Sequence, residues 1–187
     1  LPLLPLVHRH AARRGSEEPP TPLRARGAFD LVRGSRAIQG ALVASALLGI
    51  VGGASNVLVP LALDTLGLGA GRIGLAFGVA SAAWIAAAAL VGRLPADVVN
   101  LRTLGVSLAV LGLIWLLPAA RLSTVALVVF LVASTGCRAV TNVLNFAVGA
   151  RASLGDSGPV VISLLNMVWA LFAIVSPLVA GVAEGSA

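Results

Sequence analysis

Residues 122–148 read LSTVALVVFLVASTGCRAVTNVLNFAV, an apolar run that carries a single charged residue, Arg138. A helix needs about 20 mainly apolar residues to cross the roughly 30 Å hydrocarbon core of a bilayer, and this run is longer than that. An arginine at mid-bilayer costs at least about 3 kcal/mol on insertion scales, so such a residue normally faces a bundle interior or a water-filled cavity. The stretch therefore predicts a membrane-spanning helix with one polar face.

Four further apolar runs share this pattern and lie at residues 37–63, 73–91, 101–117 and 160–182. The connections between them are short, and the runs show no apolar and polar alternation, so helices are predicted over strands. Residues 1–36 precede them as the end of an earlier helix (1–7) and a basic loop (8–36), with a short amphipathic surface helix at 23–36. The predicted fold is an all-α integral membrane bundle of about five transmembrane helices.

The composition agrees with a bilayer protein, because 58% of the 187 residues are hydrophobic, 11% are charged and the mean hydropathy is +1.01. Soluble domains carry about 25% charged residues. All 13 basic residues are arginines, and the net charge is +6. These arginines fall in loops between apolar runs and form no basic face with stacking aromatics, which excludes a nucleic-acid partner.

The arginines also predict an orientation. Seven lie in residues 8–36, and Arg93, Arg102 and Arg151 flank connections on the same side of a five-span bundle, whereas Arg72 and Arg121 lie on the other. Cytoplasmic loops carry the excess of positive charge. We therefore expect a multi-pass protein of the cell (plasma) membrane with residues 8–36 in the cytoplasm.

Polar residues inside the runs mark a candidate substrate pathway. Arg138, Asn142 and Asn145 are spaced by four and three, which places them on one helix face. The other candidates are Asn56 in the first run and Ser163, Asn166 and Trp169 in the last. Two alternatives stay open: Arg138 snorkels to the cytoplasmic interface from a helix that ends early, and Asn166 bonds only a neighbouring helix.

The first run leaves two further choices open. Gly52 and Gly53, followed by Pro60, fit either a discontinuous helix beside a substrate or ordinary close packing of continuous helices. Asp64, at the outer end of the run, is either a protonatable residue in ion coupling or a solvated loop charge.

The sequence lacks the motifs of several classes of enzyme and of metal sites. The sequence has no glycine-rich phosphate loop of the Walker type and no GxSxG nucleophile motif. Its two histidines, His8 and His10, lie outside the apolar runs, and no cluster has metal-ligand spacing. We therefore expect no enzymatic activity, no cofactor and no metal.

Several short motifs follow a basic, proline-containing segment: VPL at 59–61, LGL at 66–68 and IGL at 73–75. Further along the chain are GRLPAD at 92–97, followed by Arg102, and SPLVAG at 176–181. In this order the features resemble the C-terminal half of a major facilitator superfamily transporter. The first three motifs resemble the passage from helix seven to helix eight of that family. GRLPAD with Arg102 resembles a degenerate copy of its loop motif, and SPLVAG resembles the end of its helix eleven.

The resemblance implies that the five runs are helices seven to eleven, most of one six-helix half-bundle, and that the chain is a fragment whose N-terminal half is missing. It implies secondary active transport of a small-molecule substrate by alternating access, with efflux as the expected direction. The alternative is a non-transporting membrane scaffold or subunit that binds partner helices. A permease driven by an ATPase subunit is less favoured, because the 92–100 connection is too short for a coupling helix.

Overall fold

The structure is a computed structural model that describes residues 25–117, 123–153 and 157–185. These residues form helices and no strands, which confirms the predicted all-α class. In chain order the elements are α2 (Ala25–Gly34), α3 (Arg36–Thr65), α4 (Ala70–Val91), the short 3₁₀ helix η1 (Ala96–Val98), α5 (Leu101–Ile114), α6 (Thr124–Ala152) and α7 (Gly158–Gly185). The predicted end of a preceding helix at residues 1–7 and most of the basic loop lie outside the described residues.

Four of these helices, α3, α4, α6 and α7, are long and apolar enough to cross a membrane. They indicate a membrane-embedded protein and confirm four of the five predicted runs. The predicted run at 101–117 contains the shorter apolar helix α5, which ends at Ile114 after 14 residues. At 1.5 Å per residue, such a helix is about 21 Å long. That this run crosses the membrane stays a prediction.

Helix starts and the turn between α3 and α4 follow local rules. Ser35, Asn100 and Ser123 precede α3, α5 and α6, and each side-chain oxygen accepts a hydrogen bond from a backbone N–H of the first turn. Between α3 and α4 the chain reverses through Gly67, whose φ of +79° favours glycine. The predicted surface helix at 23–36 appears as α2, and the Gln39 side chain donates to the Val32 carbonyl near the corner with α3.

Helix α3 is continuous from Arg36 to Thr65, so the discontinuous alternative for this run is wrong. Pro60 lies inside the helix and removes one backbone donor, yet the helix continues past it to Thr65. The glycines of α3 serve close packing. A Cβ atom added at Gly49 or Gly53 would collide with a backbone carbonyl of α7, at Trp169 and Ala173 respectively.

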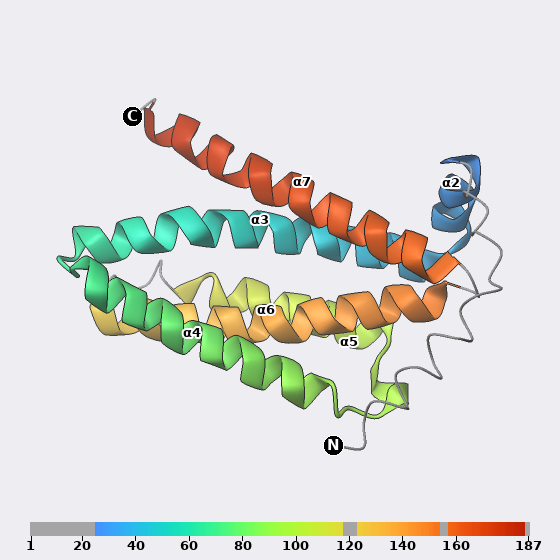
Figure 1. Ribbon diagram of the computed structural model, residues 1–187, viewed down its shortest axis with the longest axis horizontal. Helices are drawn as coiled ribbons and strands as arrows, with labels where there is room; N and C mark the ends of the chain where they lie inside the picture. Colours follow the sequence, from blue (N-terminus) through green and yellow to red (C-terminus); the bar gives the residue numbers. More distant parts are fainter. Residues whose placement is uncertain (1–24, 118–122, 154–156, 186–187) are drawn as a thin grey trace, which may run out of the picture.

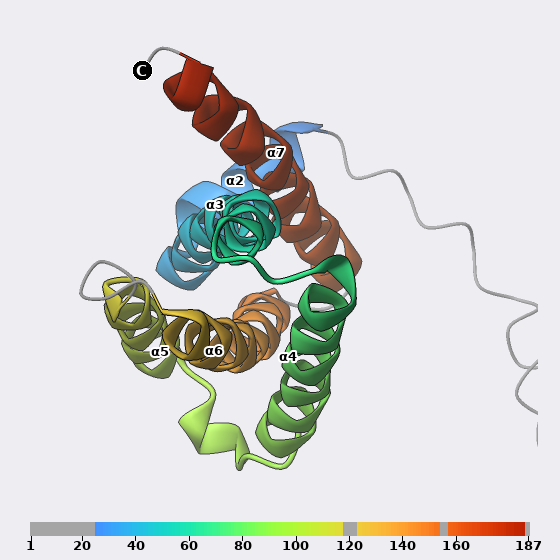
Figure 2. The same ribbon diagram turned by 90° about the vertical axis from the view of Figure 1, so that its left-hand side faces the viewer.

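The bundle is arranged around α3, which packs against α7 on one side and α6 on another (Figures 1 and 2). Helix α6 in turn contacts α4 and α5, so α5 lies at the periphery beside α6. The Ser176 hydroxyl of α7 donates to the Ile50 carbonyl of α3 at 2.9 Å. This arrangement leaves α3, α4, α6 and α7 to surround the polar interior described below.

The connection between α4 and α5 is tied to the end of α6. The Arg151 guanidinium donates to the backbone carbonyl of Val99 at 3.0 Å and also to that of Ala96. The C-terminal ends of α4 and α6 lie at the same end of the bundle as α2, and so do the N-terminal ends of α3 and α7 (Figure 1). A single arginine therefore holds the loop of residues 92–100 against this end.

Candidate functional site

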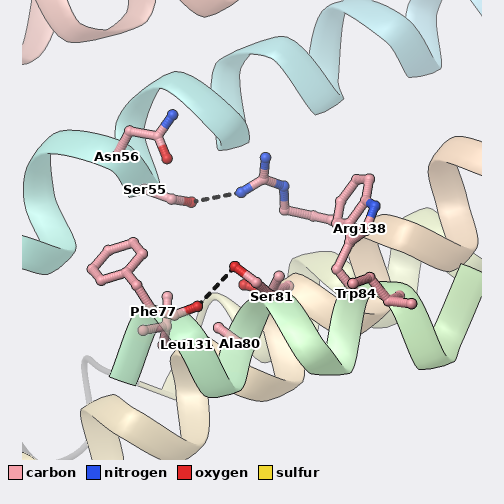
Figure 3. Close-up of a pocket in the computed structure, with 10 residues that line it drawn as sticks. Ser55, Asn56, Phe77, Ala80, Ser81, Trp84, Leu131 and Arg138 are labelled. Atoms are coloured by element: carbon pink, nitrogen blue, oxygen red, sulfur yellow. Dashed lines mark hydrogen bonds between the residues drawn. The ribbon is translucent and has the colours of Figure 1, made fainter. Parts of the chain in front are cut away.

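A cavity of about 300 Å³ lies between α3, α4 and α6 (Figure 3). Its walls combine hydroxyl, amide, guanidinium and aromatic groups. The lining residues are Ser55, Asn56, Phe77, Ala80, Ser81, Trp84, Ile85, Leu131, Thr135 and Arg138. The site therefore lies within the helices that are long enough to span a membrane, and each of the three contributes a polar side chain to it.

Arg138 extends from α6 across this cavity towards α3. Its Nη1 donates to the Ser55 hydroxyl at 3.5 Å, and the guanidinium carbon lies 5.9 Å from the centroid of the Trp84 ring. Gly52 makes room for it, because a Cβ at that position would stand 2.9 Å from Nη2. Figure 3 shows the guanidinium between α3 and Trp84 of α4.

A second cavity has a volume of about 250 Å³. It is lined by Leu48, Trp84, Arg138, Asn142, Phe146, Asn166 and Trp169, so α7 joins the wall. Arg138 and Trp84 line both cavities. The two cavities therefore share one charged and one aromatic side chain.

Of the residues proposed from sequence, five line these two cavities: Asn56, Arg138, Asn142, Asn166 and Trp169. Asn145 lies elsewhere: it is fully buried between α3 and α6, where its amide nitrogen donates to the Ser45 hydroxyl at 2.7 Å. The amide oxygen of Asn145 has no hydrogen-bond partner within the described structure. Ser163 is exposed and lines neither cavity, and Asp64 is exposed at the end of α3.

The electrostatics of the cavities are one-sided. Among the described residues, Arg138 is the only ionisable one that lines either cavity, and none of them is acidic. The aspartates whose side chains the structure describes, Asp30, Asp64 and Asp97, are all exposed. Arg138 forms no ion pair with any of them. The interior thus presents a positive charge that the described residues leave without a counter-ion.

Sequence reasoning did not include three polar residues of the wall, namely Ser55, Ser81 and Thr135. Two of them had a usable signal, because Thr135 precedes Arg138 by three residues and Ser81 precedes Trp84 by three, which is one helical turn. Ser134, which extends the Arg138 face at i−4, is instead buried and donates to the Leu131 carbonyl of its own helix.

No group of three or more histidine, cysteine, aspartate or glutamate side chains gathers anywhere in the described part of the chain. The chemistry of the site is therefore that of hydrogen bonds, one fixed positive charge and aromatic surface. Comparison with known protein families, curated proteins and solved structures finds no match to this chain.

Proposed function

We propose that the chain forms part of a secondary transporter whose small-molecule substrate passes through the two cavities at Arg138. The observation that carries the proposal is the position of this arginine. Arg138 lies near the middle of α6, a helix long enough to span a membrane, and its side chain lines two cavities. Ionisable residues at such depth are rare and mark substrate or ion pathways.

The wall of the site supports movement of a substrate between helices. Asn56, Asn142 and Asn166 come from α3, α6 and α7, and each lines a cavity. A site composed of side chains from several spanning helices changes shape when those helices rock against each other, which is the basis of alternating access. The packing of α3 and α7 through glycines gives this wall closely apposed backbones.

The resemblance in sequence supports a finer version of the proposal, in which the helices belong to the C-terminal half of a major facilitator superfamily exporter. The peripheral place of α5 beside α6 agrees with a lipid-facing supporting helix. In this version residues 8–36 are cytoplasmic, the protein resides in the plasma membrane, and a second half-bundle completes the pathway.

A membrane scaffold is the second candidate, and one observation favours it: α4 and α7 expose many large apolar side chains, among them Leu75, Ile85, Met167 and Leu171. Such surfaces suit lipid or partner helices. A scaffold, however, has no use for a half-buried arginine beside two cavities, so only the transport function requires Arg138.

The test compares transport by the wild-type chain and an Arg138→Gln variant in membrane vesicles from the source cells, where natural partners are present. Three radiolabelled probes of similar size cover the charge classes: benzenesulfonate, benzyltrimethylammonium and methyl glucoside. We expect protein-dependent movement of at least one probe, and a loss of about tenfold or more in the variant, because the substitution removes the charged donor that lines both cavities.

Arg102→Gln is the matched control, since Arg102 is exposed at the start of α5 and lines neither cavity. It should transport like the wild type. Equal transport by the Arg138 variant and the wild type, with equal amounts in the membrane, would remove Arg138 from the pathway and leave the scaffold as the better reading.

A further inference from the structure

The geometry points to an organic anion as the ligand of the Arg138 cavities, with its acidic group on the guanidinium and its apolar body against Trp84. This inference rests on the proposed function, because it names the substrate class of the same site. It follows from three features of the described structure: the unused donors of Arg138, the absence of an acidic wall and the aromatic surface beside the charge.

The donors of Arg138 are mostly unused. A guanidinium carries five N–H donors in a rigid planar fork, and within the described part of the chain a single long hydrogen bond, to Ser55 at 3.5 Å, engages them. The Ser55 hydroxyl already donates to the Val51 carbonyl at 2.5 Å, so it serves Arg138 only as an acceptor. A carboxylate, sulfonate or phosphate group matches the remaining donors, because it accepts two parallel hydrogen bonds from one guanidinium.

The charge around the fork selects for anions. Apart from Arg138, the described residues of the cavity walls carry hydroxyl, amide, indole and apolar groups, and none of them carries a carboxylate. An isolated charge at membrane depth is unfavourable, and an anionic ligand relieves it by forming an ion pair. A cationic ligand would meet repulsion from Arg138 and no compensating group among the described residues.

The aromatic side chains beside the Arg138 guanidinium determine which apolar group of a ligand fits the cavities. Trp84 lines both cavities, together with Phe77 in the first and Phe146 and Trp169 in the second. The cavities measure about 300 and 250 Å³, which is near the lower end of the roughly 300–1,000 Å³ of sites for small organic ligands. A ring of one or two aromatic units therefore fits, with its acidic group held at Arg138.

Binding is measured with the chain reconstituted in lipid nanodiscs. Radiolabelled benzenesulfonate is the probe, and benzyltrimethylammonium and methyl glucoside are its cationic and neutral counterparts. We expect saturable binding of benzenesulfonate alone, at least about tenfold weaker in Arg138→Gln and unchanged in Arg102→Gln, since a charged hydrogen-bonding partner is lost only in the first.

Arg138→Lys separates the two roles of the guanidinium. Lysine keeps the charge and loses the planar fork, so the affinity for benzenesulfonate should fall between those of the wild type and Arg138→Gln. Tighter binding of the cation or the neutral probe than of benzenesulfonate, or benzenesulfonate binding unaffected in Arg138→Gln, would overturn the inference.

A second measurement keeps Arg138 in place, in case its substitution prevents folding. Cys137, the single cysteine, is replaced by serine, and a thiol is introduced as Ser81→Cys in the cavity or as Asn100→Cys on the exposed connection. Two methanethiosulfonate reagents, one with a sulfonate and one with a trimethylammonium group, then label each thiol. The ratio of anionic to cationic labelling rates should be about tenfold higher in the cavity than on the connection, because the field of Arg138 acts on both reagents in opposite directions. Equal ratios at the two positions would overturn the inference.

The two proposals fail in different ways. Benzenesulfonate binding without movement in vesicles would support the anion site and contradict transport. Movement of benzyltrimethylammonium or methyl glucoside that depends on Arg138 would support transport and contradict the anion site.

Discussion

Substitution of Gly53 by alanine tests whether α3 and α7 pack through their backbones. A Cβ at Gly53 would collide with the Ala173 carbonyl and would stand 3.0 Å from Cδ of Pro177 and 3.1 Å from Cβ of Ser176. Ordinary contacts of a Cβ begin at 3.4 Å. The carbonyl belongs to the backbone of a helix and cannot rotate away, so α7 itself must move.

The expected cost follows from that movement. A displacement of about 1 Å forfeits a quarter to a half of the attraction between the atoms that separate. Overpacked positions of this kind lose about 1–3 kcal/mol of stability. At a helix position with open space around it, glycine to alanine stabilises the protein by up to about 1 kcal/mol through helix propensity. The backbone contact at Gly53 therefore turns a stabilising substitution into a destabilising one.

Gly105→Ala is the matched control, because Gly105 lies inside α5 and a Cβ there meets no atom within 4 Å. The free energy of unfolding of both variants is measured by steric trapping in bicelles. We expect Gly53→Ala to be less stable than Gly105→Ala by about 2 kcal/mol or more. Equal stability of the two variants would refute the backbone packing of α3 on α7.

Three further changes probe other contacts. Ser45→Ala and Asn145→Leu, singly and together, form a double-mutant cycle that should give a coupling of about 0.6–1.7 kcal/mol, as interhelical hydrogen bonds in membranes do, and a coupling of zero would contradict the 2.7 Å bond. Arg151→Gln should speed hydrogen exchange and proteolysis in the 92–100 connection without changing benzenesulfonate binding, whereas unchanged exchange would show that the two carbonyl contacts do not hold the loop. Ser123→Ala should lower stability by about 0.5–2 kcal/mol in the same bicelle assay, because it removes the N-cap acceptor of α6, and an unaltered stability would contradict the cap.

The sequence predicted the spanning helices well where apolar runs ended in clear start and stop signals. For α5, the apolar residues continue to Leu117, whereas the helix ends at Ile114. Hydropathy depends on residue type and not on backbone conformation, so an apolar run does not define the residue at which its helix ends.

The candidate site could be predicted in part, because helical spacing defines which residues of one helix share a face. Arg138 and Asn142 line the cavities as the spacing suggested. Asn145 shares that face, but its amide donates a hydrogen bond to Ser45 of α3. Helix α3 therefore covers the face of α6 at Asn145 and leaves it open at Arg138 and Asn142. Which neighbour covers which turn depends on the crossing of helices that are far apart in the sequence, and a single-helix pattern contains no information on it.

The contact between α3 and α7 has a consequence for biosynthesis. Ser176 and Ile50, which are hydrogen-bonded across it, are separated by 126 residues along the chain. At about 5–20 residues per second, a ribosome needs roughly 6–25 s to make the intervening segment. Throughout that interval the glycine face of α3 is already in the membrane and lacks the helix that fits it. The helix that is made first among the four therefore reaches its final surroundings only when the last has been inserted.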